Sequence, residues 1–294
     1  FDYSVTLEYD KDYLLIQSTI KNVNDFLILN GIDPEAIDLE ITGKMEKNGK
    51  KYGIGSSGSV VVLVIKAMFE LYCKKSGGKF FSKETIFKLA AYTLLKLGDN
   101  GSMGDLACIS YESMVFYTSF DRKKIRELIE KETLKDILEA DWNYEVSELY
   151  FDEKKLNQNN LSCEFLVGWT KEPAISKDLI NIVKNSICES ENFLENVEEV
   201  VKKLREAIRN GDKLTIKECI DENGKLLENL KENIYNKKLK ELVNATKNLD
   251  ICAKSSGAGG GDCGIALSFN EKDTRIVVEK WRELGIELLY SEKL

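Results

Sequence analysis

The sequence contains no histidine, and this absence removes whole classes of active site. Without histidine there can be no Ser-His-Asp triad and no histidine-ligated metal. The seven cysteines form no C-x-x-C pair, and an odd number in a chain of 294 residues is typical of reduced thiols rather than of a disulfide framework. We therefore expect a cytoplasmic protein.

The sequence also has few prolines, no long apolar run and no excess of positive charge. Only two prolines and 43% apolar residues exclude Pro-rich repeats and a disordered chain. The longest strongly apolar run, residues 60–65, is broken by Lys66 and is far shorter than the roughly 20 residues of a membrane-spanning helix. A net charge of −8 argues against a nucleic-acid-binding surface. We expect neither a membrane nor a nucleic acid as partner.

The hydrophobic patterns that remain predict an α+β protein. An alternating pattern predicts strands, whereas apolar residues three and four apart predict helices. The apolar segment 59–73 is too long for a typical strand, so we expect a buried helix there. The strands are expected at residues 3–9, 36–42, 114–118, 165–169, 265–269 and 286–290. The other helices are expected at 12–30, 82–97 with Ser82 as N-cap, shortly after Asp105, over most of 178–250, and at 272–284.

Two domains are expected from the length and from an Asn/Gln cluster at residues 157–160, which is typical of a boundary. The predicted domains are residues 1–160 and 161–294. Because the chain begins with Phe1 rather than Met, we expect further residues to precede it.

A first glycine-rich loop reads G-I-G-S-S-G-S at residues 53–59 and leads directly into the apolar helix. Glycines let backbone N–H groups approach an anion, and the helix N-terminus adds unpaired donors. The spacing resembles a P-loop, but Ser59 stands where the P-loop has lysine. Positive charge must then come from a metal ion or from a lysine such as Lys51. The alternative is a loop that only caps the helix.

Asp99 and Asp105 lie in a second loop, G-D-N-G-S-M-G-D-L at residues 98–106. Asp105 is a candidate for orienting an attacking group or binding a cation. The structural alternative is a capping box, because Ser102-x-x-Asp105 has the required spacing.

A third loop, residues 254–264, has five glycines in eight residues and lies between a predicted helix and a predicted strand. A flexible linker is one explanation, but a linker joins independent pieces, so a close backbone approach to a ligand fits better. Two Gly/Ser loops and an Asp-bearing loop without histidine point to phosphoryl transfer, which needs positioning and charge neutralisation.

Together the three loops resemble the GHMP kinase family. Five segments carry the resemblance: G-K-M-E at 43–46, G-K-K-Y-G-I-G-S-S-G-S at 49–59, G-D-N-G-S-M-G-D-L-A-C at 98–108, F-L-V-G-W-T at 165–170 and K-S-S-G-A-G-G-G-D-C-G-I-A at 254–266. The last is highly specific. These segments are most similar to those of members that phosphorylate 5-phosphomevalonate. The resemblance implies a two-domain fold with a ferredoxin-like C-terminal domain that carries inserted helices, and ATP and Mg²⁺ as cofactors. The family's first motif has no counterpart and is expected before Phe1.

The resemblance also implies roles for individual residues. Asp105 matches the family's active-site aspartate, and Lys51 is expected beside the transferring phosphate. Ser57 is expected to hold Mg²⁺. The nucleotide phosphates are expected at Gly53, Gly55, Ser56, Ser57, Gly58 and Ser59, and the substrate at Ser102, Gly257, Ala258, Gly259 and Gly260. Two alternatives remain: another kinase of the family, such as one with the neutral hydroxyl of mevalonate as acceptor, and a non-catalytic nucleotide or metabolite sensor.

Overall fold

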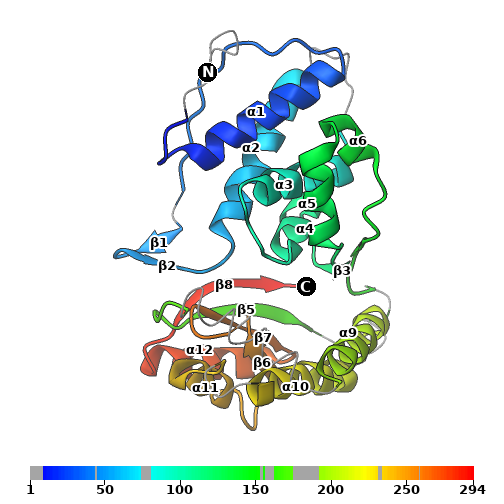
Figure 1. Cartoon of the computed structure of the whole chain (residues 1–294). Coiled ribbons are helices and arrows are strands. Elements are labelled where there is room, and N and C mark those ends of the chain that lie inside the picture. The colour runs from blue at the N-terminus through cyan, green and yellow to red at the C-terminus, as the bar shows by residue number, and fades with distance from the viewer. Residues whose placement is uncertain are drawn as a thin grey trace. The chain divides into compact units, whose positions relative to one another are not determined.

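The protein is described by a computed structural model that covers residues 9–43, 45–73, 81–152, 155, 162–174, 192–230, 234–257 and 259–294 (Figure 1). Contacts between residues divide the chain into two units. The N-terminal unit comprises Phe1–Gly43 and Gly55–Glu148, and the C-terminal unit comprises Lys44–Ile54 and Leu149–Leu294. The expected domain boundary after residue 160 and nearly all of the strand expected at 3–9 lie outside the described residues.

The described part of the N-terminal unit is mainly helical (Figure 1). Its strands β3 (Val115–Thr118) and β4 (Glu145–Glu148) pair antiparallel. Ser82 caps α3 as expected, since its Oγ accepts the N–H of Thr85 at 3.0 Å. The helices are α1 (Leu14–Leu29), α2 (Ser56–Cys73), α3 (Lys83–Lys96), α4 (Gly104–Tyr111), α5 (Arg122–Lys131) and α6 (Leu134–Glu139).

The strand expected at residues 36–42 is wrong, because this segment is irregular in the structure. Its alternating pattern has another cause. Ile37 and Leu39 are partly buried against the hydrophobic core of the unit, while Ile41 is exposed. Ile37 and Leu39, two residues apart, therefore pack inward although the segment forms no sheet ladder with any described strand.

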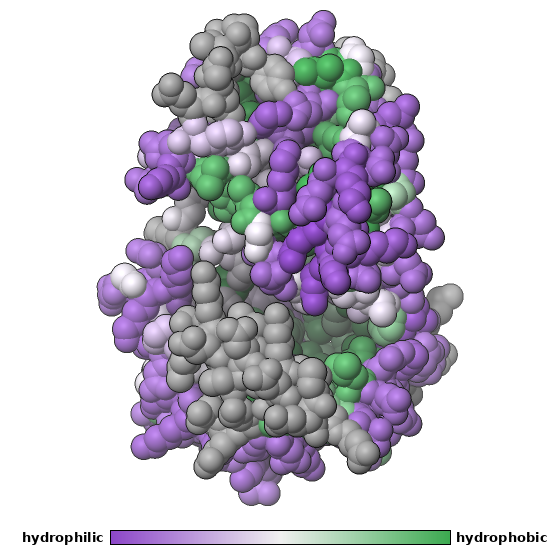
Figure 2. Space-filling view, in the orientation of Figure 1, coloured by the Kyte–Doolittle hydropathy of each residue, from purple (hydrophilic) through white to green (hydrophobic). Residues whose placement is uncertain are grey.

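The helix α2 is the centre of this core, as the apolar segment predicted. Its buried side chains, such as Val61, Ile65 and Met68, pack with α1, α3 and α4. By length and composition alone, α2 is long and apolar enough to cross a membrane. The sequence had argued against such a helix, because Lys66 breaks the apolar run. Lys66, the residue that interrupts the run, donates to the carbonyl of Ile109 and pairs with Glu112 of the same unit. The described residues on the face in Figure 2 are mainly hydrophilic.

The C-terminal unit is built on one antiparallel sheet with the strand order β6–β7–β5–β8 (Figure 1). The strands are β5 (Glu164–Trp169), β6 (Ile251–Ser255), β7 (Cys263–Ser268) and β8 (Glu287–Lys293). The helices are α9 (Phe193–Asn210), α10 (Lys213–Leu230), α11 (Lys237–Asn244) and α12 (Glu271–Glu283). The three strands and the last helix expected here are thus confirmed to within a few residues, while residues 178–191 of the expected helical region lie outside the described ones.

Successive side chains along a strand point to opposite faces of the sheet, and here the two faces pack in two different hydrophobic cores. Leu166 and Ala253 pack with α11 and α12, whereas Phe165 and Cys252 pack with α9 and α10. The unit also contains a short hairpin of β1 (Glu46–Lys47) and β2 (Lys50–Lys51), which comes from the N-terminal half of the chain. The segment that leads to the first glycine-rich loop is therefore fixed on the C-terminal unit.

Candidate active site

The first glycine-rich loop is divided between the two units, since Gly53 belongs to the C-terminal unit and Gly55 to the N-terminal unit. Gly55 has φ +79°, and its carbonyl accepts both the N–H and the Oγ of Ser59 at 3.0 Å, which starts helix α2. The Ser59 hydroxyl is thus engaged by the backbone. Ser56 is half-buried, whereas Ser57 is exposed and has no hydrogen-bond partner among the described residues. The first N–H groups of α2 lack intrahelical acceptors, as in any helix, and remain available to an anion.

Asp105 lies directly against this loop, within the N-terminal unit. Its Oδ2 is 3.0 Å from the position that a Cβ would occupy at Gly55 and 2.8 Å from the corresponding position at Gly58. A side chain at either position would push into the carboxylate. The two glycines therefore allow Asp105 and the start of α2 to approach, and the structure brings Asp105 together with the predicted phosphate loop.

The capping box expected from Ser102 and Asp105 is wrong. Helix α4 begins at Gly104, and its N-cap is Met103, which has φ 65° and makes no side-chain cap. The Met103 side chain is buried in the core, its backbone is in the left-handed conformation, and Asp105 is the second residue of the helix. The carboxylate of Asp105 is thus not engaged with Ser102.

The Asp105 carboxyl has a pKa raised above its ordinary value, chiefly because burial removes water from the charged form. Nearby Asp99 acts in the same direction, while the backbone N–H groups of Leu106 and of Asp105 itself oppose the shift. A desolvated carboxylate beside a helix N-terminus is typical of a functional site.

The loop at 98–104 that leads to Asp105 is fastened by side chains from β3 and α5. The carbonyls of Asp99, Gly101 and Ser102 each receive a side-chain donor, so the backbone before α4 is held at several points. Tyr117 Oη and Ser119 Oγ donate to the Ser102 carbonyl at 2.7 and 3.2 Å, Arg122 Nη1 to the Gly101 carbonyl at 3.1 Å, and Arg126 Nη2 to the Asp99 carbonyl at 2.8 Å and to Asn100 Oδ1. Sequence reasoning missed these residues, because a donor 15 to 27 positions from its acceptor leaves no local signal.

The third glycine-rich loop lies in the C-terminal unit, between β6 and β7. A Cβ at Gly259, which has φ +85°, would overlap the carbonyl of Ile234, and one at Gly261 would lie 2.6 Å from the carbonyl of Glu172. Glycine is required at these two positions because a backbone carbonyl of another segment lies close to each of them. Gly260 donates to the Ile234 carbonyl at 2.7 Å, whereas Gly257 has open space around it. Ala258 lies outside the described residues.

Gly53 packs against Asp262, also within the C-terminal unit, because a Cβ on Gly53 would overlap the Asp262 carboxylate. Oδ1 of Asp262 accepts the N–H of Ala174 at 3.1 Å, and its carbonyl accepts the N–H of Thr170 at 2.8 Å. Asp262 therefore has a structural role in joining the end of β5 to both loops. Lys51, at the end of β2, is exposed and has no ion pair among the described residues.

The chain is similar to known protein families and to individual proteins. The family models "GHMP kinases N terminal domain" and "GHMP kinases C terminal" match residues 15–113 and 204–287. The phosphomevalonate kinase of Streptomyces sp. (strain CL190) is 29% identical over 282 residues, which are 92% of this chain and 72% of that protein. The mevalonate kinase of Methanocaldococcus jannaschii is 26% identical over 92% of this chain and 74% of its own length.

A solved structure is more similar still. Streptococcus pneumoniae phosphomevalonate kinase in complex with phosphomevalonate and AMPPNP has 46% sequence identity and a TM-score of 0.89, and the match covers 100% of this chain and 85% of that one. The Lin0012 protein from Listeria innocua has 28% identity with the same TM-score and covers 100% of this chain and 82% of its own.

Proposed function

This chain belongs to the GHMP kinase family, and we propose that it transfers the γ-phosphate of ATP to 5-phosphomevalonate, giving ADP and 5-diphosphomevalonate in the mevalonate route to isoprenoids. The observation that carries the proposal is the likeness, over the whole chain, to the Streptococcus pneumoniae enzyme solved with phosphomevalonate and an ATP analogue. We also propose a cytoplasmic location, in keeping with the cysteine pattern.

The chemistry fits a site without histidine. The acceptor is a phosphomonoester whose second pKa is about 6, so it is mostly a dianion at neutral pH and needs little help from a base. An oxygen of this phosphate attacks the γ-phosphorus, and the bond from that phosphorus to the bridging oxygen of ADP breaks. The obstacle is the repulsion between two highly charged phosphates, which donors and cations must offset.

We assign the β- and γ-phosphates to the backbone N–H groups at the start of α2. Gly55, Ser56 and Gly58 supply N–H groups there, and the positive end of the α2 dipole favours the anion. Because the Ser59 hydroxyl is bound to the Gly55 carbonyl, Ser59 contributes its position rather than its oxygen. The hydroxyl of Ser57 is exposed and is available to a ligand.

Asp105 is proposed to orient the acceptor and the cation that accompanies it. The Asp105 carboxylate and the Ser57 hydroxyl are oxygen donors of the kind that Mg²⁺ prefers, and Mg²⁺ commonly uses one or two carboxylates together with substrate phosphates. No group of three acidic or cysteine ligands occurs among the described residues, which is in keeping with an ion that arrives with the nucleotide. When bound, Mg²⁺ neutralises phosphate charge.

The remaining assignments concern single residues of the second β-strand and of the other two loops. Lys51 is proposed to contact the transferring phosphate, because its ammonium is exposed and unpaired in the described part of the chain. Ser102 is proposed to contact the substrate, since its Oγ accepts only a long bond of 3.4 Å from the N–H of Gly104. In the third loop, Gly257 has the open space that a ligand needs, whereas Gly259 and Gly260 shape the backbone beside it.

The test is ADP release measured with a panel of acceptors. We expect turnover with 5-phosphomevalonate and none with mevalonate; the reverse result would assign the chain to the mevalonate kinases instead. Asp105→Asn should lower kcat at least about a hundredfold. The matched control is Asp99→Asn in the same loop, whose carboxylate accepts the N–H of Gly101 and which should remain active. Full activity of Asp105→Asn would remove this residue from the mechanism.

Asp105→Asn should also be at least as stable as the parent at neutral pH. Because the folded-state pKa of Asp105 is raised, the folded protein binds this proton more readily than the unfolded chain does. The ionised carboxylate therefore costs stability as the pH rises from the ordinary carboxyl range. The asparagine variant removes that cost, and thermal unfolding between pH 4 and pH 8 (about) measures it.

A further inference from the structure

Strand β6 is the outer strand of the described sheet in the C-terminal unit, so one side of its backbone has no partner among the described strands. The Phe269 N–H donates to the Asp250 carbonyl, and the Ser256 N–H donates to the Cys263 carbonyl, both at 3.0 Å. In an antiparallel ladder the bonded residues alternate, so positions 250, 252, 254 and 256 bond to β7. The N–H and C=O groups of Ile251, Ala253 and Ser255 therefore point away from the sheet.

The outward groups of Ser255 are satisfied by side chains of the protein itself. Its N–H donates to Tyr235 Oη at 3.0 Å, and its carbonyl accepts Lys254 Nζ at 2.8 Å. The outward groups of Ile251 and Ala253 have no such partner among the described residues, although these residues are only 5% and 3% exposed. Buried backbone groups of this kind are costly unless a water molecule or a ligand pairs with them.

A cavity of about 500 Å³ lies at this open edge, between β6, α10 and α11. We call it the β6 pocket. Its volume falls within the range of small-molecule sites, roughly 300–1,000 Å³. Val243, Leu249, Ile251 and Ala253 contribute an apolar floor, and four lysines stand around it: Lys217, Lys225, Lys240 and Lys247.

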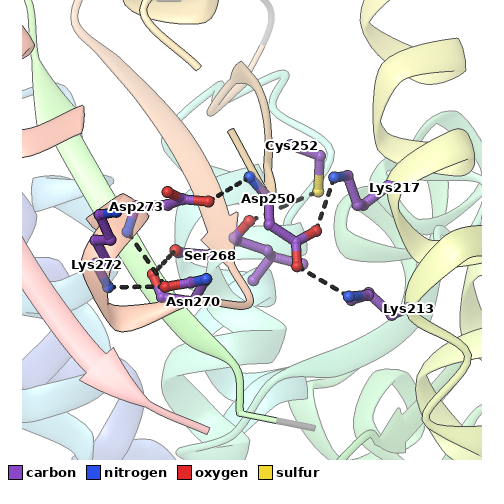
Figure 3. Close-up of polar contacts among 9 residues, drawn as sticks. Lys213, Lys217, Asp250, Cys252, Ser268, Asn270, Lys272 and Asp273 are labelled. Carbon is purple, nitrogen blue, oxygen red and sulfur yellow. Dashed lines mark hydrogen bonds and ion pairs between the residues drawn. The ribbon is translucent and has the colours of Figure 1, made fainter. Parts of the chain in front are cut away.

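The charge of the β6 pocket favours an anion, although the chain as a whole is acidic. Lys240 is paired with Glu228 at 3.2 Å, and Lys217 with Asp250 at 2.9 Å, as Figure 3 shows for the latter. Lys225 and Lys247 have no ion pair in the described part of the chain. Asp221 is the remaining acidic residue of the lining, and it faces Lys217 and Lys225. With Lys240 paired to Glu228 and Lys217 to Asp250, Lys225 and Lys247 remain against the single carboxylate of Asp221, which leaves an excess of positive charge.

We propose that the β6 pocket is a ligand site for a small anion with a planar amide-like edge, such as a pyrimidine carrying a carboxylate. The donor and acceptor of the amide edge pair with the free C=O and N–H groups of β6, and the acidic group lies among the lysines. The flat ring covers the apolar floor. This site uses no residue that we assign to phosphoryl transfer, so it is independent of the proposed function.

Orotate is a suitable probe, because it has both the pyrimidine amide edge and a carboxylate but no phosphate and no adenine. We expect it to bind the full chain at millimolar concentration or below and to shift the backbone amide resonances of Ile251 and Ala253 in NMR spectra. Charge reversal of both free lysines, Lys225→Glu with Lys247→Glu, should weaken binding about tenfold or more. Lys272→Glu, at an exposed position of α12, is the matched control and should bind like the parent.

Three results would overturn the proposal. The first is the absence of orotate binding to the parent protein at saturating millimolar concentration. The second is binding that leaves the amides of Ile251 and Ala253 unshifted or that persists in the doubly reversed variant. The third is pairing of an extended acidic peptide with β6 in place of orotate. ADP release should be unaffected by the lysine substitutions, so this test and that of the kinase activity fail separately.

Discussion

Gly58→Ala is the sharpest test of the contact between the phosphate loop and Asp105. Gly58 lies in the first turn of α2, and a Cβ there would be 2.8 Å from Asp105 Oδ2 and 3.0 Å from a methyl group of Leu106. Ordinary contacts of a Cβ begin at about 3.4 Å, so the carboxylate must withdraw by about 0.6 Å. The atoms that yield are the ends of side chains, not backbone.

The expected cost in stability is small. Alanine in a helix is favoured over glycine by about 0.5–1 kcal/mol, and crowding in a packed site costs about 1–3 kcal/mol. These two terms oppose each other, so the free energy of unfolding should fall by no more than about 2.5 kcal/mol. The rate is more sensitive, because misplacing a reacting group by about 1 Å costs up to a hundredfold. We expect kcat to fall about ten- to a hundredfold.

The assay is ADP release with 5-phosphomevalonate, accompanied by thermal unfolding of each variant. Gly224→Ala, in the middle of α10, is the matched control, since a Cβ there meets nothing closer than Tyr235 Oη at 3.3 Å. In the Asp105→Asn background Gly58→Ala should add little, because both changes act through one carboxylate. A folded Gly58→Ala protein with the parent's kcat would refute the contact as a determinant of rate.

Two further substitutions test the surroundings of the loops. Tyr117→Phe removes the donor to the Ser102 carbonyl, so we expect the free energy of unfolding to fall by about 1 kcal/mol. We also expect a several-fold lower kcat with little change in KM for ATP, and an unchanged kcat would contradict a positioning role of Tyr117. Burial lowers the pKa of Lys254 to about 8, so its charged form costs stability below that pH, and the cost disappears as the pH rises toward 10.5. At pH 7, Lys254→Met should therefore raise the free energy of unfolding by up to about 3 kcal/mol, less about 1 kcal/mol for the lost bond to Ser255. At pH 10 (about) the gain measured by urea unfolding should be smaller. An equal gain at both pH values would exclude the titration of Lys254 as its cause.

Much of the fold could be predicted, because the period of the apolar residues survives in the structure. The amphipathic pattern at 12–30 and the apolar segment at 59–73 became α1 and α2, since a helix with one apolar face must bury it. The segment at 36–42 failed because alternation reports which side chains are buried and not whether the backbone has a partner strand.

The candidate site could be predicted only in part. Gly55, Gly58 and Asp105 lie in short motifs, so their residue types were sufficient to single them out. The donors that fasten the Asp105 loop, such as Tyr117 and Arg126, come from a different segment and became visible only in the folded chain. The capping box failed because α4 begins one residue later than a Ser102 N-cap requires, with Met103 as the N-cap, and the Ser102-x-x-Asp105 spacing does not encode that shift.

The glycines show most clearly why one sequence signal has two physical causes. At Gly55 and Gly58 the group that excludes a Cβ is the carboxylate of Asp105, so these glycines make room for a side chain that we propose to be functional. At Gly259 and Gly261 the excluding group is a backbone carbonyl of the protein itself, so these glycines are first a requirement of the fold. A glycine-rich loop in a sequence therefore indicates close approach without telling what approaches. Only the identity of the neighbouring atom separates a position where we expect a substitution to lower the rate from one where we expect it to lower the stability.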